Sequence, residues 1–344
     1  MIRNDIKSLA AYHVQDCKGL IKLDAMENPF ALPEGLRQSW AEYVAASEIN
    51  RYPDSDMLEL RQAIAEHEGV EANQVLLGNG SDEIIQMLLI ACEPGTCVVP
   101  SPTFVMYNLI SRWLKRPVAN VELLKDFSLS ADTFLQVCAR EKASIAFLAC
   151  PNNPTGNLWS QETVEKIAKN FKGLLIIDEA YAPFSSRSHT SLIESNTVIL
   201  RTFSKIGWAG LRLGYLLGTP EIIAHLNKVR MPYNINVLTQ ASAKFLLQHS
   251  DLFRKQAEVI CKQRKVLSKS LSAIAQLEVF PSETNFLLVR VPDATATFAA
   301  LKAKGILIKS MHGQHPLLAQ CLRITIGTSE ENQSVIQAFK EIFE

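Results

Sequence analysis

The sequence has no excess of charge of either sign, and this excludes several classes of partner. Its 344 residues include 35 Lys and Arg and 35 Asp and Glu, a formal net charge of +0. Proteins that bind nucleic acid or anionic membranes by electrostatic attraction carry a basic excess or a basic patch. We therefore expect neither nucleic acid nor a membrane as a partner.

Long hydrophobic runs are also missing. Hydrophobic residues make up 47% of the chain, enough for a large core and for two or three domains. No run, however, approaches the roughly 18 residues of a membrane-spanning helix, and the N-terminus MIRNDIK lacks the apolar centre of a secretory signal. The default expectation is a cytoplasmic protein.

Cysteine pairs and metal-ligand clusters are the third absence. The seven cysteines are scattered, with no C-x-x-C pair, which is typical of reduced thiols and not of a disulfide framework. Of the seven histidines, His312 and His315 lie close together but have no cysteine or carboxylate at ligand spacing. The sequence predicts no metal.

What is present is an alternation of helical stretches and short apolar runs. From about residue 55, helical patterns over 57–67 and 83–92 alternate with apolar runs at 75–77 and 96–99. This alternation predicts an α/β fold with a mainly parallel, doubly wound central sheet.

After Asn236 the pattern changes to that of a smaller α+β domain. We predict one long helix over 239–272, then strands and helices at 277–280, 285–290, 295–304, 323–326 and from 330 onward. The predicted division is an arm, 1–40, that joins the smaller domain, a large domain, 41–240, and a small domain, 241–344.

The most informative segment surrounds Lys205. Thr202 and Ser204 offer hydroxyl donors, and Arg212 offers a planar fork that can hold a phosphate. Lys205 between them can form a Schiff base with an aldehyde. Pyridoxal phosphate carries both an aldehyde and a phosphate, although a Ser-Lys pair near an arginine is also common at a solvated helix start.

Two upstream segments supply further polar groups. Asp178 ends an apolar, β-branched run that reads as a buried parallel strand, where a carboxylate could pair with a protonated ring nitrogen, and Tyr181 follows three residues later. Asn153 lies before Pro154 in a turn-dense segment after another buried run, so its amide projects from a rigid loop. Taken alone, Asp178 could be a helix cap and Asn153 part of an ordinary turn.

Taken together, the three segments carry a resemblance. The order Asn153-Pro154-Thr155-Gly156, then Asp178-x-x-Tyr181, then Ser204-Lys205 with Arg212 downstream, resembles the fold-type I pyridoxal-phosphate aminotransferases. The resemblance implies that Lys205, Asp178 and Tyr181 act in catalysis. It implies a cofactor site made by these three and by Asn153, Thr202, Ser204, Arg212, Gly80, Ser81, Asp82 and Tyr107. Gly80, Ser81 and Asp82 look like a phosphate-binding helix start, and Tyr107 matches the aromatic residue that stacks on the ring.

Further segments are similar to those of histidinol-phosphate aminotransferases, namely 23–29, 50–54, 230–236 and 323–328. The resemblance implies a homodimer in which Tyr52 reaches the partner's cofactor phosphate. It also implies that Tyr12, Asn28, Lys309 and Arg323 line the substrate pocket. Two departures stand out: the loop between Lys205 and Arg212 is one residue shorter than usual, and Lys309 replaces an arginine, which removes a bidentate grip.

The implied reaction is ping-pong transamination. Histidinol phosphate gives its amino group to the cofactor held by Lys205, and 2-oxoglutarate then takes it, which yields imidazole-acetol phosphate and L-glutamate. Three alternatives remain open at this point: threonine-phosphate decarboxylation, aromatic amino-acid transamination, and a non-catalytic regulatory module that binds the cofactor.

Overall fold

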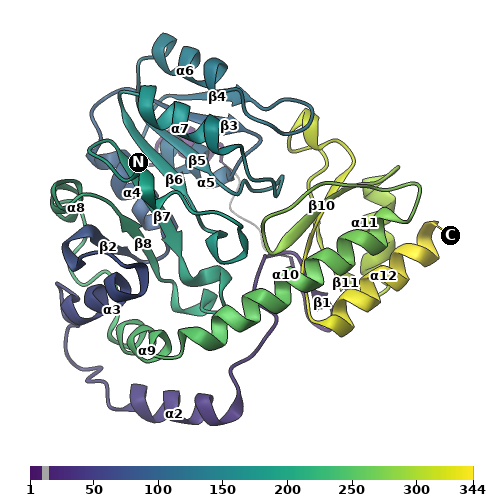
Figure 1. Ribbon diagram of the computed structural model, residues 1–344, viewed down its shortest axis with the longest axis horizontal. Helices are drawn as coiled ribbons and strands as arrows, with labels where there is room; N and C mark the ends of the chain where they lie inside the picture. The colour runs from purple at the N-terminus through teal and green to yellow at the C-terminus, as the bar shows by residue number, and fades with distance from the viewer. Residues whose placement is uncertain (10–14, 344) are drawn as a thin grey trace.

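The larger part of the protein is built on one seven-stranded sheet. The computed structural model describes residues 1–9 and 15–343 (Figure 1). The strand order is β2-β8-β7-β6-β5-β3-β4, and all strands run the same way except β8, which is antiparallel to both neighbours. The bounds are β2 (Val75–Gly78), β3 (Thr96–Ser101), β4 (Val118–Glu122), β5 (Ala143–Ala149), β6 (Leu174–Asp178), β7 (Thr197–Thr202) and β8 (Gly214–Leu217). The predicted mainly parallel, doubly wound sheet is confirmed.

Helices cover both faces of this sheet. One face packs against α4 (Ser81–Ala91), α5 (Val105–Trp113) and α8 (Pro220–Asn227), and the other against α3 (Leu58–Glu68), α6 (Ala131–Arg140), α7 (Gln161–Asn170) and α9 (Val237–Leu247). Successive strand residues point to opposite faces. In β6, Ile176 belongs to the core under α4 and α5, whereas Leu175 and Ile177 belong to the core on the other side. Burial on both faces explains why these strands read as continuous apolar runs.

The smaller part combines two short sheets with helices. Its antiparallel sheet has the order β12-β13-β10-β9, and a separate parallel pair joins β1 to β11. The bounds are β1 (Ile21–Lys22), β9 (Glu278–Val279), β10 (Phe286–Arg290), β11 (Ile306–Leu307), β12 (Lys309–Ser310), β13 (Cys321–Thr325), α11 (Ala294–Ala303) and α12 (Ser329–Phe343). The β1–β11 pair shows that a segment near the N-terminus is part of the smaller unit.

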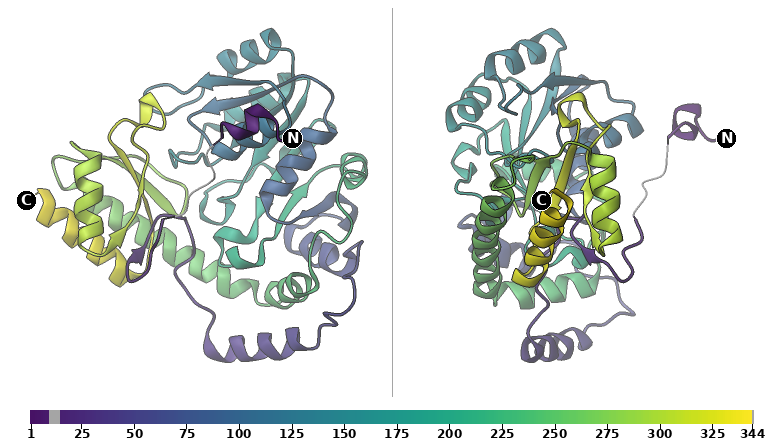
Figure 2. Two further views of the ribbon diagram at one scale, coloured as in Figure 1. Left: turned by 180° about the vertical axis from the view of Figure 1, so that it is seen from behind. Right: turned by 90° about the vertical axis from the view of Figure 1, so that its right-hand side faces the viewer.

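The N-terminal region also reaches the larger part. The short α1 (Asn4–Lys7) lies over the larger part when the molecule is seen from behind (Figure 2), and the Arg3 guanidinium donates to the Trp113 carbonyl at 2.9 Å. After β1, α2 (Glu34–Ala45) packs on α9, where the Trp40 indole donates to the Ser242 hydroxyl at 2.9 Å.

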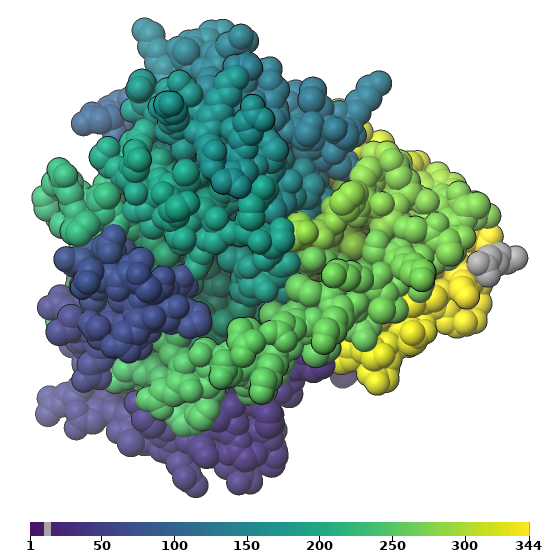
Figure 3. Space-filling view, viewed as in Figure 1, coloured from purple at the N-terminus to yellow at the C-terminus, as the bar shows by residue number. Residues whose placement is uncertain are grey.

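The prediction of one long helix over 239–272 is wrong in one respect, because two helices occupy this range. α9 ends at Leu247, and α10 (Ser250–Ser272) begins after His249, whose backbone leaves the helical region. Neither proline nor glycine marks the break, which falls within four consecutive polar residues, 248–251. α10 then runs from the larger part to the smaller one, and in the space-filling view its surface borders both (Figures 1 and 3). No helix in the described ranges has the length and apolarity needed to cross a membrane.

Arg116 holds the end of α4 in a way that its sequence context does not suggest. Its guanidinium donates to the carbonyls of Leu89 at 2.9 Å and Cys92 at 2.8 Å, which are last-turn carbonyls of the helix, and to the Ser144 hydroxyl at 2.8 Å. Carbonyls at a helix end lack partners within the helix, so a cation that donates hydrogen bonds to them stabilises the terminus.

We predict that Arg116→Met lowers the free energy of unfolding by about 2–4 kcal/mol, because several partly buried carbonyls lose a charged donor. Thermal unfolding measured beside Arg112→Met, an exposed neighbour, checks this expectation. Equal melting temperatures for the two variants would contradict the role given to Arg116.

Candidate active site

A cavity of about 390 Å³ opens where the carboxyl ends of β5, β6 and β7 meet the start of α4. Ligands of α/β sheets bind at this edge. Most of the predicted site residues line it: Ser81, Asp82, Tyr107, Asn153, Asp178, Tyr181, Thr202, Ser204, Lys205 and Arg212. Residues from five separate segments of the chain are thus brought to one place.

Lys205 ends a short turn that positions its amine in the cavity. The turn begins at Thr202, whose hydroxyl accepts the Ser204 N–H at 3.1 Å. Burial lowers the pKa of Lys205 to about 8; the positive charge of Arg323 adds to this shift, and Glu27 and Asp82 oppose it. An amine with this pKa is partly neutral near physiological pH and so can attack a carbonyl carbon.

Asp178 is the buried carboxylate of the site. The Tyr107 hydroxyl donates to its Oδ2 at 2.6 Å, and the Ala180 N–H donates to its Oδ1 at 3.0 Å. Burial raises the pKa of Asp178 to about 6, although these two hydrogen bonds oppose the shift. The carboxylate is therefore oriented and remains mostly ionised at neutral pH, as the partner of a protonated ring nitrogen must be.

The structure gives Tyr107 a different role from the predicted stacking on the cofactor ring. Its side chain is completely buried, its ring lies parallel to Phe147 at a centroid distance of 4.7 Å, and its hydroxyl holds Asp178. Phe104, one helical turn earlier, is partly exposed and lines the cavity. Sequence reasoning missed Phe104, although it lies in the same segment, because a shift of one turn keeps a residue on the same helix face.

The start of α4, where an anion site is predicted, faces the Arg212 guanidinium. Gly80 has a φ of +81°, and a Cβ atom there would lie 2.7 Å from Nη2 of Arg212. Glycine adopts this φ without strain and brings no side chain between the helix start and Arg212, so the backbone N–H groups of Ser81 and Asp82 and the Arg212 fork could approach the same ligand. The Oδ1 atom of Asp82 is buried and has no hydrogen-bond partner among the described residues.

Arg323 lies at the border of the cavity on β13. Its Nη1 donates to the Asn153 Oδ1 at 2.6 Å, and its Nη2 donates to the Asp24 carbonyl at 3.1 Å. Lys309 on β12 is the cross-strand partner of Arg323, and directly opposite residues project to the same face of a sheet. Two cations from the smaller part therefore lie on one face beside Asn153.

Among the described residues, five predicted ones do not line this cavity: Gly80, Lys309 and Arg323, which were placed above, and Asn28 and Tyr52. The Asn28 amide donates to the Ile206 carbonyl at 2.8 Å and to Gln256 Oε1 at 3.0 Å, so it holds the Lys205 loop against α10. Tyr52 is 81% exposed and stacks on Tyr233 with centroids 4.5 Å apart. Tyr12 lies outside the described residues. Within them, no group of three or more His, Cys, Asp or Glu side chains could hold a metal ion.

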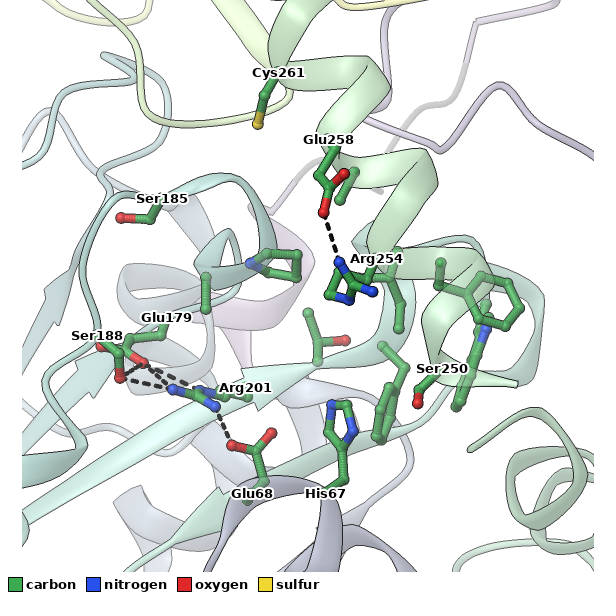
Figure 4. A pocket seen from close by; sticks show the side chains of 18 of the residues that line it. His67, Glu68, Glu179, Ser185, Ser188, Arg201, Ser250, Arg254, Glu258 and Cys261 are labelled. Carbon is green, nitrogen blue, oxygen red and sulfur yellow. Dashed lines mark hydrogen bonds and ion pairs between the residues drawn. The ribbon is translucent and has the colours of Figure 1, made fainter. Parts of the chain in front are cut away.

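A larger cavity of about 810 Å³ lies on the other side of the Lys205 loop (Figure 4). Glu68, Glu179 and Arg201 form its polar wall, whereas Ile206 and Trp208 face it from the loop. Neither Lys205 nor Asp178 borders it, so we assign the chemistry to the smaller cavity, which contains both the amine and the carboxylate.

We predict that Lys205→Met stabilises the ligand-free protein at pH 7 by about 2 kcal/mol, because the wild type must keep a charged amine in a site that lowers its pKa. The folded pKa of about 8 lies below the usual 10.5, so the penalty is present below pH 8 and disappears as the pH rises towards 10.5. The difference in melting temperature should therefore shrink over this range, with the exposed Lys172→Met as control. A constant difference would contradict the lowered pKa.

Comparisons with known proteins agree with this geometry. Residues 18–339 match the family Aminotransferase class I and II. The histidinol-phosphate aminotransferase of Methylibium petroleiphilum is 44% identical over 349 residues, which cover 99% of this chain and 94% of that protein. Histidinol-phosphate aminotransferase 2 of Nitrosococcus oceani is 46% identical, with 98% and 96% covered.

A solved structure extends the comparison to the fold. The histidinol-phosphate aminotransferase of Sinorhizobium meliloti, crystallised in complex with pyridoxal-5'-phosphate, superposes with a TM-score of 0.87 at 24% identity over 99% of this chain and 97% of the other. That likeness establishes the architecture, and the two closer sequences establish the family. The chain belongs to the class I and II aminotransferases and, among them, to the histidinol-phosphate aminotransferase family.

Proposed function

We propose that the protein catalyses pyridoxal-phosphate-dependent transamination between L-histidinol phosphate and 2-oxoglutarate, a step of histidine biosynthesis. The observation that carries this proposal is the amine of Lys205, with a pKa lowered to about 8, in one cavity with the buried carboxylate of Asp178 and the predicted anion site at the start of α4. Histidinol phosphate is taken from the names of the relatives that are 44% and 46% identical, and 2-oxoglutarate is the amino acceptor that the family resemblance implies.

The residues present fit pyridoxal phosphate group by group. The open space at Gly80 and the start of α4 suit the phosphate, with Arg212, Thr202 and Ser204 as further donors. Asp178 suits the ring nitrogen, and Tyr181 and Asn153 suit the ring hydroxyl, with Phe104 as the stacking partner. Once bound, the cofactor supplies an electron sink for the negative charge that develops at the substrate's α-carbon.

Lys205 is the proton carrier in this proposal. As a neutral amine it takes the proton from the substrate's α-carbon. As an ammonium group it then donates a proton to the C4′ carbon of the cofactor. A general base works best when its pKa lies near the working pH, and the value of about 8 meets that condition. Asp178, kept ionised and oriented by Tyr107, holds the positive charge on the ring nitrogen.

Substrate recognition falls to the smaller part in this proposal. Arg323 binds the phosphate of histidinol phosphate in one half-reaction and a carboxylate of 2-oxoglutarate in the other, because its five N–H donors in a fixed fork suit both anions. Asn153 orients the guanidinium through the 2.6 Å hydrogen bond. Lys309 adds a second positive charge on the same face of the sheet, without the bidentate geometry of an arginine.

We also propose that the active form is a homodimer. Large apolar side chains are exposed on two adjoining loops and the helix starts beside them: Ile49, Tyr52, Leu58, Met231, Tyr233 and Leu238. The loops are tied together by the Arg230 guanidinium, which donates to the Ser55 carbonyl at 2.8 Å. Exposed apolar groups gathered in this way are typical of a subunit interface. Tyr52 would then complete the phosphate site of the partner subunit.

The proposed reaction can be tested through its first half-reaction, the transfer of the amino group from histidinol phosphate to the bound cofactor. We expect the visible absorbance of the protein with bound pyridoxal phosphate to disappear when histidinol phosphate is added without a keto acid, and to return when 2-oxoglutarate follows. Threonine phosphate and phenylalanine serve as competing donors. If phenylalanine were the only donor that removed the absorbance, the protein would be an aromatic aminotransferase. If threonine phosphate released carbon dioxide, the protein would be a decarboxylase. Either result would overturn the substrate assignment.

The role of Tyr52 across the interface is tested by complementation. We predict that Tyr52→Ala and Lys205→Ala are each nearly inactive as homodimers. After subunit exchange, half of the dimers are mixed and each has one intact site, so activity should recover to about a quarter of the wild-type value. Recovery no greater than the sum of the separate variants would contradict action in trans.

A further inference from the structure

Consecutive residues at the ends of β6 and β7 face opposite sides of the sheet. Asp178 lines the active-site cavity and Thr202 lines both cavities, whereas their neighbours Glu179 and Arg201 line the larger cavity and not the active-site cavity. This follows from the period-two alternation of a strand. The residue that holds the ring nitrogen and one that holds the phosphate are thus each joined by one peptide bond to a charged residue on the back of the sheet.

The two charged neighbours bind each other. The Arg201 guanidinium donates to Glu179 Oε2 from Nε at 3.1 Å and from Nη2 at 2.7 Å (Figure 4). Its Nη1 donates to Glu68, the last residue of α3. One planar cation therefore fixes the end of β6 to β7 and both to α3, with three N–H donors directed at two carboxylates, an arrangement that the single ammonium of a lysine could not reproduce.

Further hydrogen bonds extend this network to two other segments. The Tyr215 hydroxyl on β8 donates to Glu68 Oε1 at 2.5 Å, and Tyr215 is the cross-strand partner of Arg201. The backbone N–H of His189 donates to Glu179 Oε1 at 2.5 Å. The loop after β6 is in this way attached to the same carboxylate that follows Asp178.

These charges are expensive to bury, which makes their presence informative. The Glu179 side chain is 1% exposed, and the side chains of Glu68 and Arg201 are 7% and 13% exposed. Burial alone would raise the pKa of Glu179, but His189 and Arg201 lower it. Well-packed apolar residues often give equal or greater stability than a buried ion pair. A contribution to stability is therefore a weak explanation for this network, and the fixed geometry that it imposes on the strand ends is a better one.

We propose that the Glu68–Arg201–Glu179 network is a positioning element for the cofactor site: from the back of the sheet it fixes the ends of β6 and β7 so that Asp178 and Thr202 keep the separation that the ring nitrogen and the phosphate require. This inference rests on the proposed function. It gives Arg201 and Glu179 a role in the reaction although neither lines the cavity that contains Lys205.

The network acts on two contacts at once, which sets the size of the expected effect. Partners that orient direct ligands typically change affinity by about 10–100-fold when they are removed from metal sites. We expect Arg201→Met to raise the dissociation constant of pyridoxal phosphate from the full-length protein by a factor in this range. Arg201→Lys keeps the charge but loses the fork, so its loss should be smaller, about tenfold or less.

The control is Arg116→Met, which removes another partly buried arginine that is bound to several carbonyls, on the far end of α4. The experiment measures the dissociation constant of pyridoxal phosphate by equilibrium dialysis for all four proteins, together with their melting temperatures. Hydrogen–deuterium exchange of the cofactor-free proteins gives a second readout: amides at 176–184 and 198–204 should exchange faster in the Arg201 variants and not in Arg116→Met.

The outcomes separate the two proposals. Weaker cofactor binding and faster exchange at both strand ends in the Arg201 variants, with unchanged binding in Arg116→Met, is the expected result. Binding within twofold of wild type in Arg201→Met and Arg201→Lys, or an equal loss of affinity in Arg116→Met at a similar melting temperature, would overturn the positioning role alone. A wild-type protein that binds no pyridoxal phosphate would overturn the cofactor assignment and this inference with it.

Discussion

The alternation of side chains along a strand is the constraint on which the site depends. A parallel strand buried on both faces must give its residues in turn to two different cores, and this rule continues past the last hydrogen-bonded pair. At the ends of β6 and β7 it sends Asp178 and Thr202 to the side of α4 and α5, and Glu179 and Arg201 to the side of α3. Each polar residue that faces the active-site cavity thus has a sequence neighbour on the opposite face of the sheet, and in both strands this neighbour, Glu179 or Arg201, is charged.

The environment of Lys205 shows what such a site costs. Burial disfavours the ammonium form and is the main reason that the pKa falls to about 8; the charge of Arg323 adds to this shift, and Glu27 and Asp82 oppose it. The same desolvation raises the pKa of Asp178 to about 6, so the cavity destabilises the charged form of both groups. Reactive groups are often held in this strained electrostatic state. The free-energy cost of burying these two groups is offset by the apolar cores of the protein, two centred on the larger part and one on the smaller part.

The sequence predicts the parts of the site that depend on strand ends and misses those that depend on packing. Asn153, Asp178 and Lys205 come together because β5, β6 and β7 are neighbours and parallel, which apolar runs with polar ends already indicate. Phe104 and Tyr107 differ by one helical turn, so only the packed structure decides which of them the cavity exposes. The same holds for Asn28, whose amide partners lie 178 and 228 positions away.

The break between α9 and α10 also needs the structure to be recognised. It falls within four polar residues, 248–251, and neither glycine nor proline marks it. α9 lies on the larger part, whereas the buried face of α10 extends to residues of the smaller core such as Leu267 and Leu271. In the function proposed above, the cofactor half of the site is built on one sheet and the substrate half, with Arg323, on another. The hydrogen bond from Arg323 to Asn153 joins the two halves directly, so a change of this arginine on β13 also acts on a residue of the cofactor half.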